Sequence, residues 1–321
     1  MKTAFLYAGQ GSQHAGMGKD LYDAFPEFRN AFDSADPGFD LHKLCFEDPD
    51  GLLIQTQYTQ PCLVAFAVGV TAILRNAGIK PDYAAGLSLG EYSALESAGV
   101  FDAHTAIETV AFRGKAMAEA SKGIDCGMTA VLGLSEELLQ GCCDTASASN
   151  DGIVSICNYN CPGQLVIGGS KAAVDAATEL AKAAGAKRCI PLSVSGPFHT
   201  RLMQPAGDAL KAYFEKMNFS PMQFPVLFNC LGRENTENLP VPELLVRQVQ
   251  RSVRMEDIIR RLFALGVTSF IEIGPGRTLT GFVRKTAKAA GIEDCHCACL
   301  ETWEEINALL TQPEVITRKE K

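Results

Sequence analysis

The sequence lacks several features that would assign it to a specialised class of protein. Its 321 residues contain no C-x-x-C spacing and only five histidines, and its longest apolar run, residues 62–74, is shorter than the roughly twenty residues that cross a bilayer. This run predicts a buried core helix that begins at Pro61. The chain also lacks excess positive charge: its formal net charge is -8. It therefore has no global basic field for a nucleic-acid backbone or an anionic membrane.

What the chain does contain is the composition of a soluble globular protein, with 47% hydrophobic and 21% charged residues. Its first residues lead directly into glycines, too soon for a secretory apolar region, which predicts a cytoplasmic protein. The twelve cysteines are predicted to be free thiols packed as small hydrophobes. Cys295, Cys297 and Cys299 alternate, which suits one face of a strand better than a metal site. We expect no metal.

Short apolar segments alternate with longer helical patterns, which indicates an α/β fold. The predicted strands at residues 3–8, 83–87 and 269–273 each end at a glycine-rich turn or at Ser88. In parallel α/β sheets the ligand site lies beyond the carboxyl ends of the strands. We therefore expect the functional residues at these three turns.

The middle of the chain predicts a different arrangement. Its segments have the order strand, helix, strand, strand, helix, strand, at residues 128–134, 135–143, 153–158, 164–168, 170–184 and 187–192. This order is the ferredoxin-like split motif. It predicts a small insert within the larger α/β domain. The chain after Trp303, which ends at residues 318–321, is predicted to be frayed.

Gly86-Leu87-Ser88-Leu89-Gly90 fits the G-x-S-x-G pattern, in which small residues let a strand turn sharply into a helix and expose the serine hydroxyl. The predicted helix at residues 91–98 begins with Glu91, whose charge the helix dipole favours there. The pattern predicts a serine nucleophile. Among the five histidines, His199 follows a strand in a turn-rich loop and is the favoured base. His14 is the rival base, and either histidine could be structural.

Gly9-Gln10-Gly11-Ser12-Gln13 has no third glycine for a dinucleotide fingerprint and no Gly-Lys pair for a phosphate loop. It could place the N–H of Gln10 beside that of Leu89 as an oxyanion site, or be an ordinary turn. Arg113 lies in a helical pattern at residues 106–120. It is either a solvated surface residue or a clamp for a substrate carboxylate, and the spacing does not choose between the two.

Five motifs in register resemble the malonyl-CoA:acyl carrier protein transacylases over residues 3–285. The motifs lie at residues 9–13, 87–95, 113–117, 158–164 and 196–199. The resemblance implies an α/β fold with an α/β-hydrolase-like large domain, residues 1–125 and 196–321, and an inserted ferredoxin-like domain, residues 126–195.

The resemblance also implies a ping-pong transfer in fatty acid biosynthesis. Each site residue then has an implied role: Ser88 as nucleophile, His199 as base, Gln10 and Leu89 as oxyanion donors through their backbone N–H groups, Arg113 as partner of the malonyl carboxylate, Gln248 as the residue whose carbonyl orients the histidine, and Asn158 as a substrate contact. Malonyl-CoA is the implied substrate, with no bound cofactor. Holo acyl carrier protein is the implied partner of a monomeric enzyme.

Two positions depart from the family pattern: Leu87 stands where a histidine usually precedes the nucleophile, and Ala8 replaces a proline. Phe198, directly before His199, resembles the malonyl-type version of the motif at residues 196–199 in related polyketide acyltransferases. Because the implied carrier is itself acidic, we expect a local basic patch among Lys182, Lys187, Arg188, Arg284, Lys285 and Lys288. The alternatives are an acyltransferase that loads a polyketide carrier, a serine esterase or thioesterase, and a catalytically silent carrier-binding protein.

Overall fold

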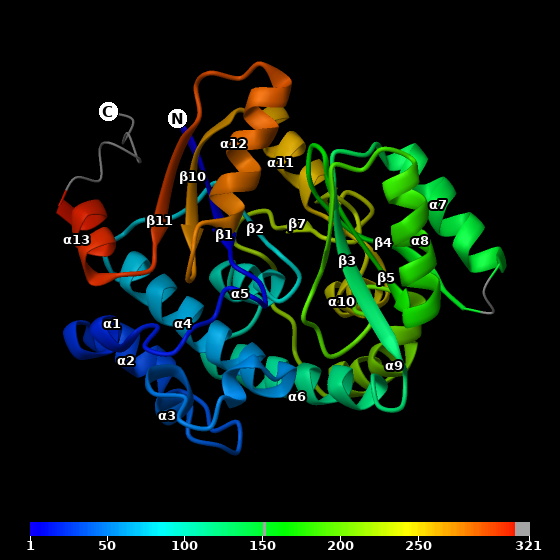
Figure 1. The fold of residues 1–321 in the computed structure, drawn as a ribbon. Coiled ribbons are helices and arrows are strands. Elements are labelled where there is room, and N and C mark those ends of the chain that lie inside the picture. The colour runs from blue at the N-terminus through cyan, green and yellow to red at the C-terminus, as the bar shows by residue number, and fades with distance from the viewer. Residues whose placement is uncertain (150–151, 312–321) are drawn as a thin grey trace.

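The computed structural model describes residues 1–149 and 152–311, and its fold has two domains (Figure 1). The large domain is built on a parallel sheet of four strands in the order β11-β10-β1-β2. Their bounds are β1 Lys2–Tyr7, β2 Tyr83–Gly86, β10 Val267–Ile273 and β11 His296–Leu300. The predicted strands are confirmed, and β1, β2 and β10 end at the turns where function was expected.

Helices cover both faces of this sheet. In β1, Phe5 and Tyr7 face one apolar core and Ala4 and Leu6 face another, because successive side chains of a strand point to opposite faces. Both faces are buried, as is usual for parallel sheets. The large-domain helices are α1 Lys19–Ala24, α2 Pro26–Phe32, α3 Leu41–Phe46, α4 Thr56–Asn76, α5 Gly90–Ser97, α6 Ala103–Ala120, α9 Gln204–Phe214, α10 Val241–Gln250, α11 Met255–Ala264, α12 Thr278–Ala290 and α13 Trp303–Thr311, with one-turn helices at Leu52–Ile54 and Arg201–Met203.

The predicted ferredoxin-like insert is confirmed as an antiparallel sheet with two helices, drawn in green in Figure 1. The order of its elements is β3 Cys126–Leu132, α7 Glu136–Ser149, β4 Val154–Cys161, β5 Gln164–Ser170, α8 Lys171–Ala183 and β6 Arg188–Pro191. Its strands pair in the order β6-β3-β5-β4. One face packs on α7 and α8, and the other joins the main core through Met128, Ala130, Cys157 and Val166.

A short strand of the large domain also joins this sheet, which the sequence did not predict. β9, Val253–Arg254, pairs in parallel with β4 at Asn158 and Tyr159. Two further short strands, β7 Leu227–Phe228 and β8 Arg233–Glu234, form a hairpin, and Val226 next to β7 bridges to Ala84 of β2. The two domains are therefore joined by backbone hydrogen bonds as well as by side chains.

The predicted start of the core helix at Pro61 is wrong, because α4 begins five residues earlier at Thr56. Proline removes one N–H from the helix, and this loss is tolerated because most of the apolar side chains of α4 are buried. With 21 residues, α4 is long and apolar enough to cross a membrane by length and composition, although most of it is buried inside the protein. It is the one helix with these properties in residues 1–149 and 152–311.

The other differences lie at the ends of elements and at the cysteines. Of the tail predicted to be frayed after Trp303, residues 304–311 belong to α13, whose Ile306 and Leu309 pack into the core. The rest of that tail, residues 312–321, lies outside the described part. α7 extends six residues beyond the predicted Cys143, because Ala146 continues its apolar face. All twelve cysteines are free thiols, and Cys297 and Cys299 lie in β11 as the alternation predicted.

Candidate active site

Ser88 occupies the sharp turn between β2 and α5 that the G-x-S-x-G pattern predicts. Its φ of +52° is left-handed, a conformation that L side chains rarely adopt. A Cβ on Gly86 would lie 2.0 Å from the carbonyl carbon of Gly90, and a Cβ on Gly90 would lie 2.1 Å from the carbonyl oxygen of Tyr7. Both glycines are therefore needed for the turn, which leaves the Ser88 hydroxyl at the carboxyl edge of the sheet.

His199 is the histidine that contacts this serine. Its Nε2 lies 2.7 Å from Ser88 Oγ, and its Nδ1 lies 2.8 Å from the carbonyl oxygen of Gln248. Because a carbonyl only accepts hydrogen bonds, Nδ1 carries the proton and Nε2 is free to accept one from the serine. Burial, followed by the positive charge of Arg113, lowers the pKa of His199 to about 4. At neutral pH the imidazole is uncharged, as a general base requires.

Arg113 projects from α6 into the same site, so its interpretation as a solvated surface residue is wrong. The side chain is 1% exposed. Nη2 donates to Ser88 Oγ at 3.2 Å and to Gln248 Oε1 at 3.0 Å, while Nη1 donates to Gln60 Oε1 at 2.8 Å. The guanidinium also lies over the Tyr92 ring, 5.3 Å from its centroid. All these partners are uncharged, and Arg113 forms no ion pair with a carboxylate of the described residues.

The two predicted oxyanion donors lie at the ends of neighbouring strands. Leu89 follows Ser88, and Gln10 follows β1 in the glycine turn. Within the described residues, neither backbone N–H donates a hydrogen bond to the protein. A Cβ on Gly9 would lie 2.4 Å from the Leu87 carbonyl oxygen, so this glycine lets the Gln10 turn approach the nucleophile turn closely. Leu87, which replaces the usual histidine, packs against the apolar core beneath β1 and β2.

Four residues of the site were missed or given too small a part by the sequence. Gln60 of α4 binds Arg113 and also contacts Gln10, with its Nε2 3.4 Å from Gln10 Oε1. Thr56 accepts a hydrogen bond from Gln10 Nε2 at 3.0 Å. Asn229 contacts the backbone of Ser88, and Glu91, predicted only as a helix-start residue, binds Asn229. Gln60 and Asn229 are polar residues beside buried apolar segments, which is the signal that could have identified them.

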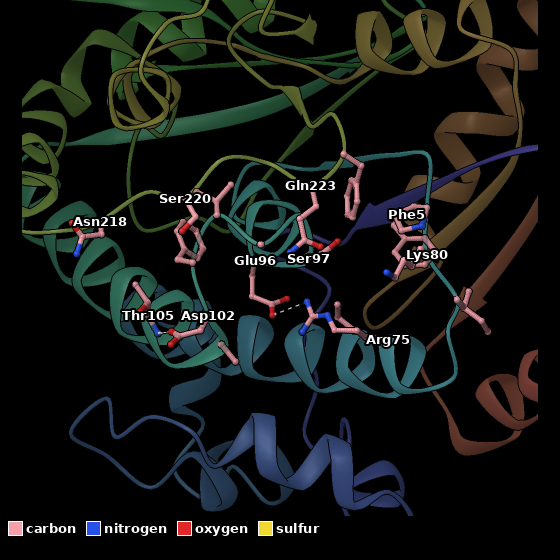
Figure 2. Close-up of a pocket in the computed structure, with 18 residues that line it drawn as sticks. Phe5, Arg75, Lys80, Glu96, Ser97, Asp102, Thr105, Asn218, Ser220 and Gln223 are labelled. Carbon is pink, nitrogen blue, oxygen red and sulfur yellow. Dashed lines mark hydrogen bonds and ion pairs between the residues drawn. The ribbon is translucent and has the colours of Figure 1, made fainter.

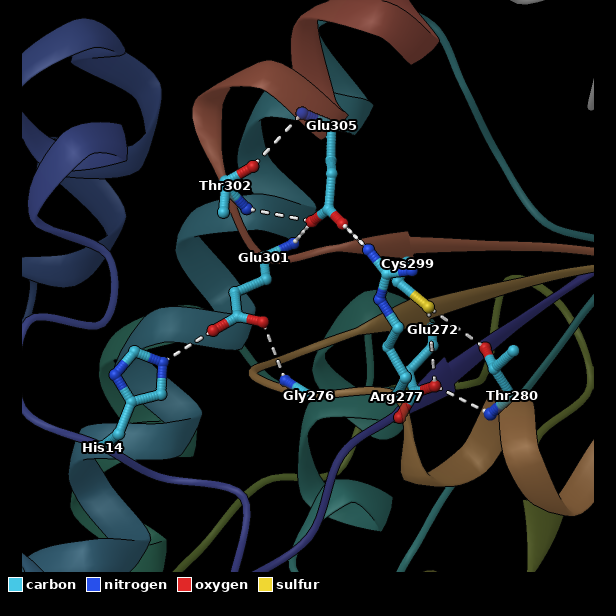
Figure 3. Close-up of polar contacts among 9 residues, drawn as sticks. All are labelled: His14, Glu272, Gly276, Arg277, Thr280, Cys299, Glu301, Thr302 and Glu305. Atoms are coloured by element: carbon cyan, nitrogen blue, oxygen red, sulfur yellow. Dashed lines mark hydrogen bonds and ion pairs between the residues drawn. The ribbon is translucent and has the colours of Figure 1, made fainter.

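Asn158 and His14 do not reach the serine. Asn158 lies in β4, opposite Val253 of β9, and no hydrogen bond among the described residues joins it to Ser88, His199 or Arg113. His14 Nε2 binds Glu301 Oε1 at 2.6 Å (Figure 3), and the histidine is half-exposed. Figure 3 also shows Glu301 accepting from the Gly276 N–H, so His14 ties the chain after β1 to the chain after β10 and β11. His14, the rival candidate for the general base, therefore lies outside the site.

One cavity borders a predicted site residue, and a larger cavity does not. One of about 520 Å³ borders His199 and lies between the insert and the large domain. Another, of about 780 Å³, lies at the far end of α5 and is lined by Arg75, Lys80, Glu96 and Gln223 among others (Figure 2). None of the predicted site residues lines this second cavity. The described residues contain no group of three or more His, Cys, Asp or Glu that could hold a metal ion.

Comparisons with known proteins agree with this geometry. Residues 4–312 match the family model described as the acyl transferase domain. The malonyl CoA-acyl carrier protein transacylase of Bacillus subtilis (strain 168) is 43% identical over 286 residues, which are 88% of this chain and 90% of that protein. The crystal structure of the corresponding Clostridium perfringens protein is similar with a TM-score of 0.91, 37% identity and coverage of 98% of both chains.

A third similar structure is a malonyl-transacylase in complex with a holo type II PKS acyl-carrier protein. It gives a TM-score of 0.90 at 38% identity and covers 97% of this chain and 100% of that one. The class that the fold and the match define is therefore the acyl transferases. Within that class, the chain belongs to the malonyl-CoA:acyl carrier protein transacylase family, as its five motifs predicted.

Proposed function

We propose that this chain is an acyltransferase that moves a malonyl group from malonyl-CoA to the phosphopantetheine thiol of acyl carrier protein, in fatty acid biosynthesis. The observation that carries the proposal is Arg113. It is 1% exposed, its Nη2 lies 3.2 Å from Ser88 Oγ, and it has no carboxylate partner among the described residues. A buried charge of this kind is costly unless a partner of opposite sign arrives. The free carboxylate of a malonyl group is such a partner.

In the first half-reaction, His199 Nε2 takes the hydroxyl proton of Ser88 as Oγ attacks the thioester carbonyl. The resulting oxyanion accepts hydrogen bonds from the backbone N–H groups of Gln10 and Leu89. The carbon–sulfur bond then breaks, and the sulfur of CoA leaves with the proton from His199. In the second half-reaction the carrier thiol gives its proton to His199 and attacks the malonyl-serine. The Ser88 oxygen leaves and regains that proton, so the enzyme returns to its starting state.

Arg113 has two roles in the proposed mechanism. It pairs with the malonyl carboxylate, which selects malonyl over acetyl and covers one side of the acyl group. Its positive charge is also one cause of the low pKa of His199. A substrate carboxylate beside Arg113 would offset this charge, while burial, the larger cause of the low pKa of His199, remains.

The orientation of His199 argues against a serine esterase or thioesterase. Such an enzyme normally uses a carboxylate to orient its histidine, whereas His199 Nδ1 faces the neutral carbonyl of Gln248. A polyketide carrier is the second candidate acceptor, and the similarity to a transacylase in complex with a type II PKS carrier favours it. Purified carriers of the two kinds, offered to the same malonyl-enzyme, distinguish the two acceptors by their rates.

The remaining parts of the proposal concern partners and organisation. We take the enzyme to be a cytoplasmic monomer without a bound cofactor, membrane or nucleic acid. Its domains would divide at residues 125/126 and 195/196, as supported by β3 beginning at Cys126 and β6 ending at Pro191. The acidic carrier would dock on basic residues near the domain junction, where Lys285 Nζ of α12 donates to Gln164 Oε1 at the start of β5. Asn158 would contact the substrate from β4.

The test uses radiolabelled malonyl-CoA and holo carrier protein. The wild-type chain should become labelled in the absence of carrier and should pass the label to the carrier on mixing. Ser88→Ala should form no labelled enzyme and transfer at a rate reduced by at least about a thousandfold. Label on the Ser88→Ala variant, or equal transfer from acetyl-CoA and malonyl-CoA by the wild type, would show that the proposed mechanism is wrong.

A further inference from the structure

The turn that carries Ser88 is held by a residue outside the predicted site, Asn229. Its side-chain Oδ1 accepts the Ser88 N–H at 2.6 Å, and its Nδ2 donates to the Gly86 carbonyl oxygen at 2.7 Å. A single amide thus binds the backbone on both sides of Leu87. The two contacts fix the orientation of the amide, because the Ser88 N–H needs an acceptor and the Gly86 carbonyl needs a donor.

The backbone of Asn229 is itself fixed on both sides. Its N–H donates to Glu91 Oε2 at 2.5 Å, and its carbonyl oxygen accepts from the Arg254 N–H of β9 at 3.0 Å. Asn229 and Glu91 are both 0% exposed. Asn229 also directly follows β7, whose neighbour Val226 bridges to β2. Any rotation of Asn229 would leave several buried polar groups without partners, which proteins avoid.

These bonds act on a backbone conformation that the serine would not adopt unaided. Ser88 has a φ of +52°, and such conformations persist only where the surroundings enforce them. Gly86 and Gly90 give the turn its space, but they form no side-chain bond that keeps Ser88 in it. Asn229 supplies the two bonds, and from the resulting position Ser88 Oγ lies 2.7 Å from His199 Nε2.

We propose that Asn229, anchored by Glu91, is a positioning residue that holds Ser88 in the left-handed conformation from which its hydroxyl reaches His199. The proposal rests on the proposed function in taking Ser88 as the nucleophile. Asn229 touches only the backbone of the turn, whereas Arg113 and Gln248 contact the Ser88 side chain or its carbonyl from other elements. Loss of the Asn229 amide should therefore slow the attack by the serine and leave the binding of the malonyl carboxylate nearly unchanged.

The experiment compares Asn229→Ala and Asn229→Asp with the wild-type chain. Alanine removes both bonds, and aspartate keeps the size but replaces the donor to Gly86 with an oxygen. Each variant should form labelled malonyl-enzyme roughly a hundredfold more slowly, the scale expected for a reacting group displaced by about 1 Å. The KM for malonyl-CoA should change less than about threefold, because uniform binding is unaffected. Aspartate keeps the proposal testable if the alanine variant does not fold.

Two further variants separate positioning from general destabilisation. Leu262→Ala removes a fully buried side chain of α11 from the apolar core that also contains Leu227 of β7. It touches no bond of the turn, so its folded fraction should label at the wild-type rate. Glu91→Gln keeps an oxygen that can accept the Asn229 N–H, so it should stay within a few-fold of wild type, whereas Glu91→Ala should fall well below it. Wild-type labelling by Asn229→Ala, or a loss matched by Leu262→Ala at equal folded fraction, would overturn the proposal.

A fluorophosphonate probe distinguishes this proposal from the proposed function. The probe reports the reactivity of Ser88 without a malonyl group, so Asn229→Ala should react with it more slowly by a similar factor. A wild-type chain that reacts with the probe but not with malonyl-CoA would contradict the proposed function and leave the Asn229 comparison valid. Equal reaction of the probe with wild type and Asn229→Ala would contradict the positioning role alone.

Discussion

The two ends of α5 each bury a carboxylate, but only one end is built around a nucleophile. At the amino end, Glu91 binds Asn229, and burial raises the pKa of Glu91 to about 8. At the carboxyl end, Glu96 Oε1 pairs with Arg75 at 3.1 Å, and burial raises the pKa of Glu96 to about 7. In each carboxyl group the other oxygen has no hydrogen-bond partner among the described residues.

The difference lies in the neighbours of each carboxylate. Around Glu91, the side chains of Asn229, Gln248 and Arg113 all bind Ser88. Around Glu96, the partner Arg75 is about half-exposed at 49% and both residues line the 780 Å³ cavity (Figure 2). A buried carboxylate with a raised pKa is therefore a weak indicator of an active site. Convergence of several buried polar groups on one nucleophile is the stronger one.

Among the tests of this comparison between the two ends of α5, removal of the Arg113 charge near the amino end should have the largest effect. Arg113→Ala should lower kcat/KM for malonyl-CoA by roughly thirtyfold or more, the cost of removing one partner of a buried charge pair. The rate with acetyl-CoA should change much less, because acetyl has no carboxylate. Glu96→Gln, at the other end of the helix, is the matched control and should leave both rates unchanged. An unaltered malonyl to acetyl ratio in Arg113→Ala would contradict the clamp.

A smaller effect is expected in the pH dependence of enzyme acylation. His199 is an effective base only when neutral, and its pKa in the free enzyme is about 4. The rate constant kcat/KM for labelling should therefore hold down to about pH 5 and fall below it. In Arg113→Met, one cause of the low pKa is gone, so the acidic limb should move to higher pH with acetyl-CoA as donor. A limb at the same pH in both proteins would show that Arg113 does not act on His199.

The smallest effect concerns stability. The folded pKa values of Glu91 and Glu96 lie above the ordinary 4.5, so the native state binds these protons more tightly than the unfolded chain. Their contribution is complete below pH 4.5 and is lost as pH rises through about 7 for Glu96 and about 8 for Glu91. Each Glu→Gln variant should flatten the fall in unfolding free energy over that window, as measured by urea denaturation. A slope unchanged in both variants would exclude a titration of either group.

Much of the fold was predictable because its signals are local. The order of short apolar segments and helical patterns identified the insert, the apolar runs before glycine turns identified β1, β2 and β10, and the G-x-S-x-G pattern located the elbow. The pairing of β9 with β4 was not predictable, since a two-residue strand has no periodicity of its own. The start of α4 was misplaced because Pro61 normally marks a first turn, and burial of the helix outweighed that signal.

The site was predictable only where a motif marks it. Ser88 and His199 follow from turn chemistry and from the family resemblance, and the structure places them in contact. Arg113 was left between two interpretations, because a helical pattern with mixed polarity does not show which side the core lies on. Asn229 and Gln60 were missed because their role depends on distance in space: Asn229 is 141 residues from Ser88 in the chain.

The pairing of β9 with β4 also bears on how a substrate enters. β9 follows α10, which carries Gln248, and the insert is anchored to it by backbone hydrogen bonds at Asn158 and Tyr159. Rotation of the insert away from the large domain would break these backbone hydrogen bonds. It would also displace Arg254, whose N–H donates to the carbonyl oxygen of Asn229. The architecture instead suits an acyl group that is carried to Ser88 on a long, flexible chain while the insert stays in place. Both malonyl-CoA and a carrier protein present their cargo on such an arm.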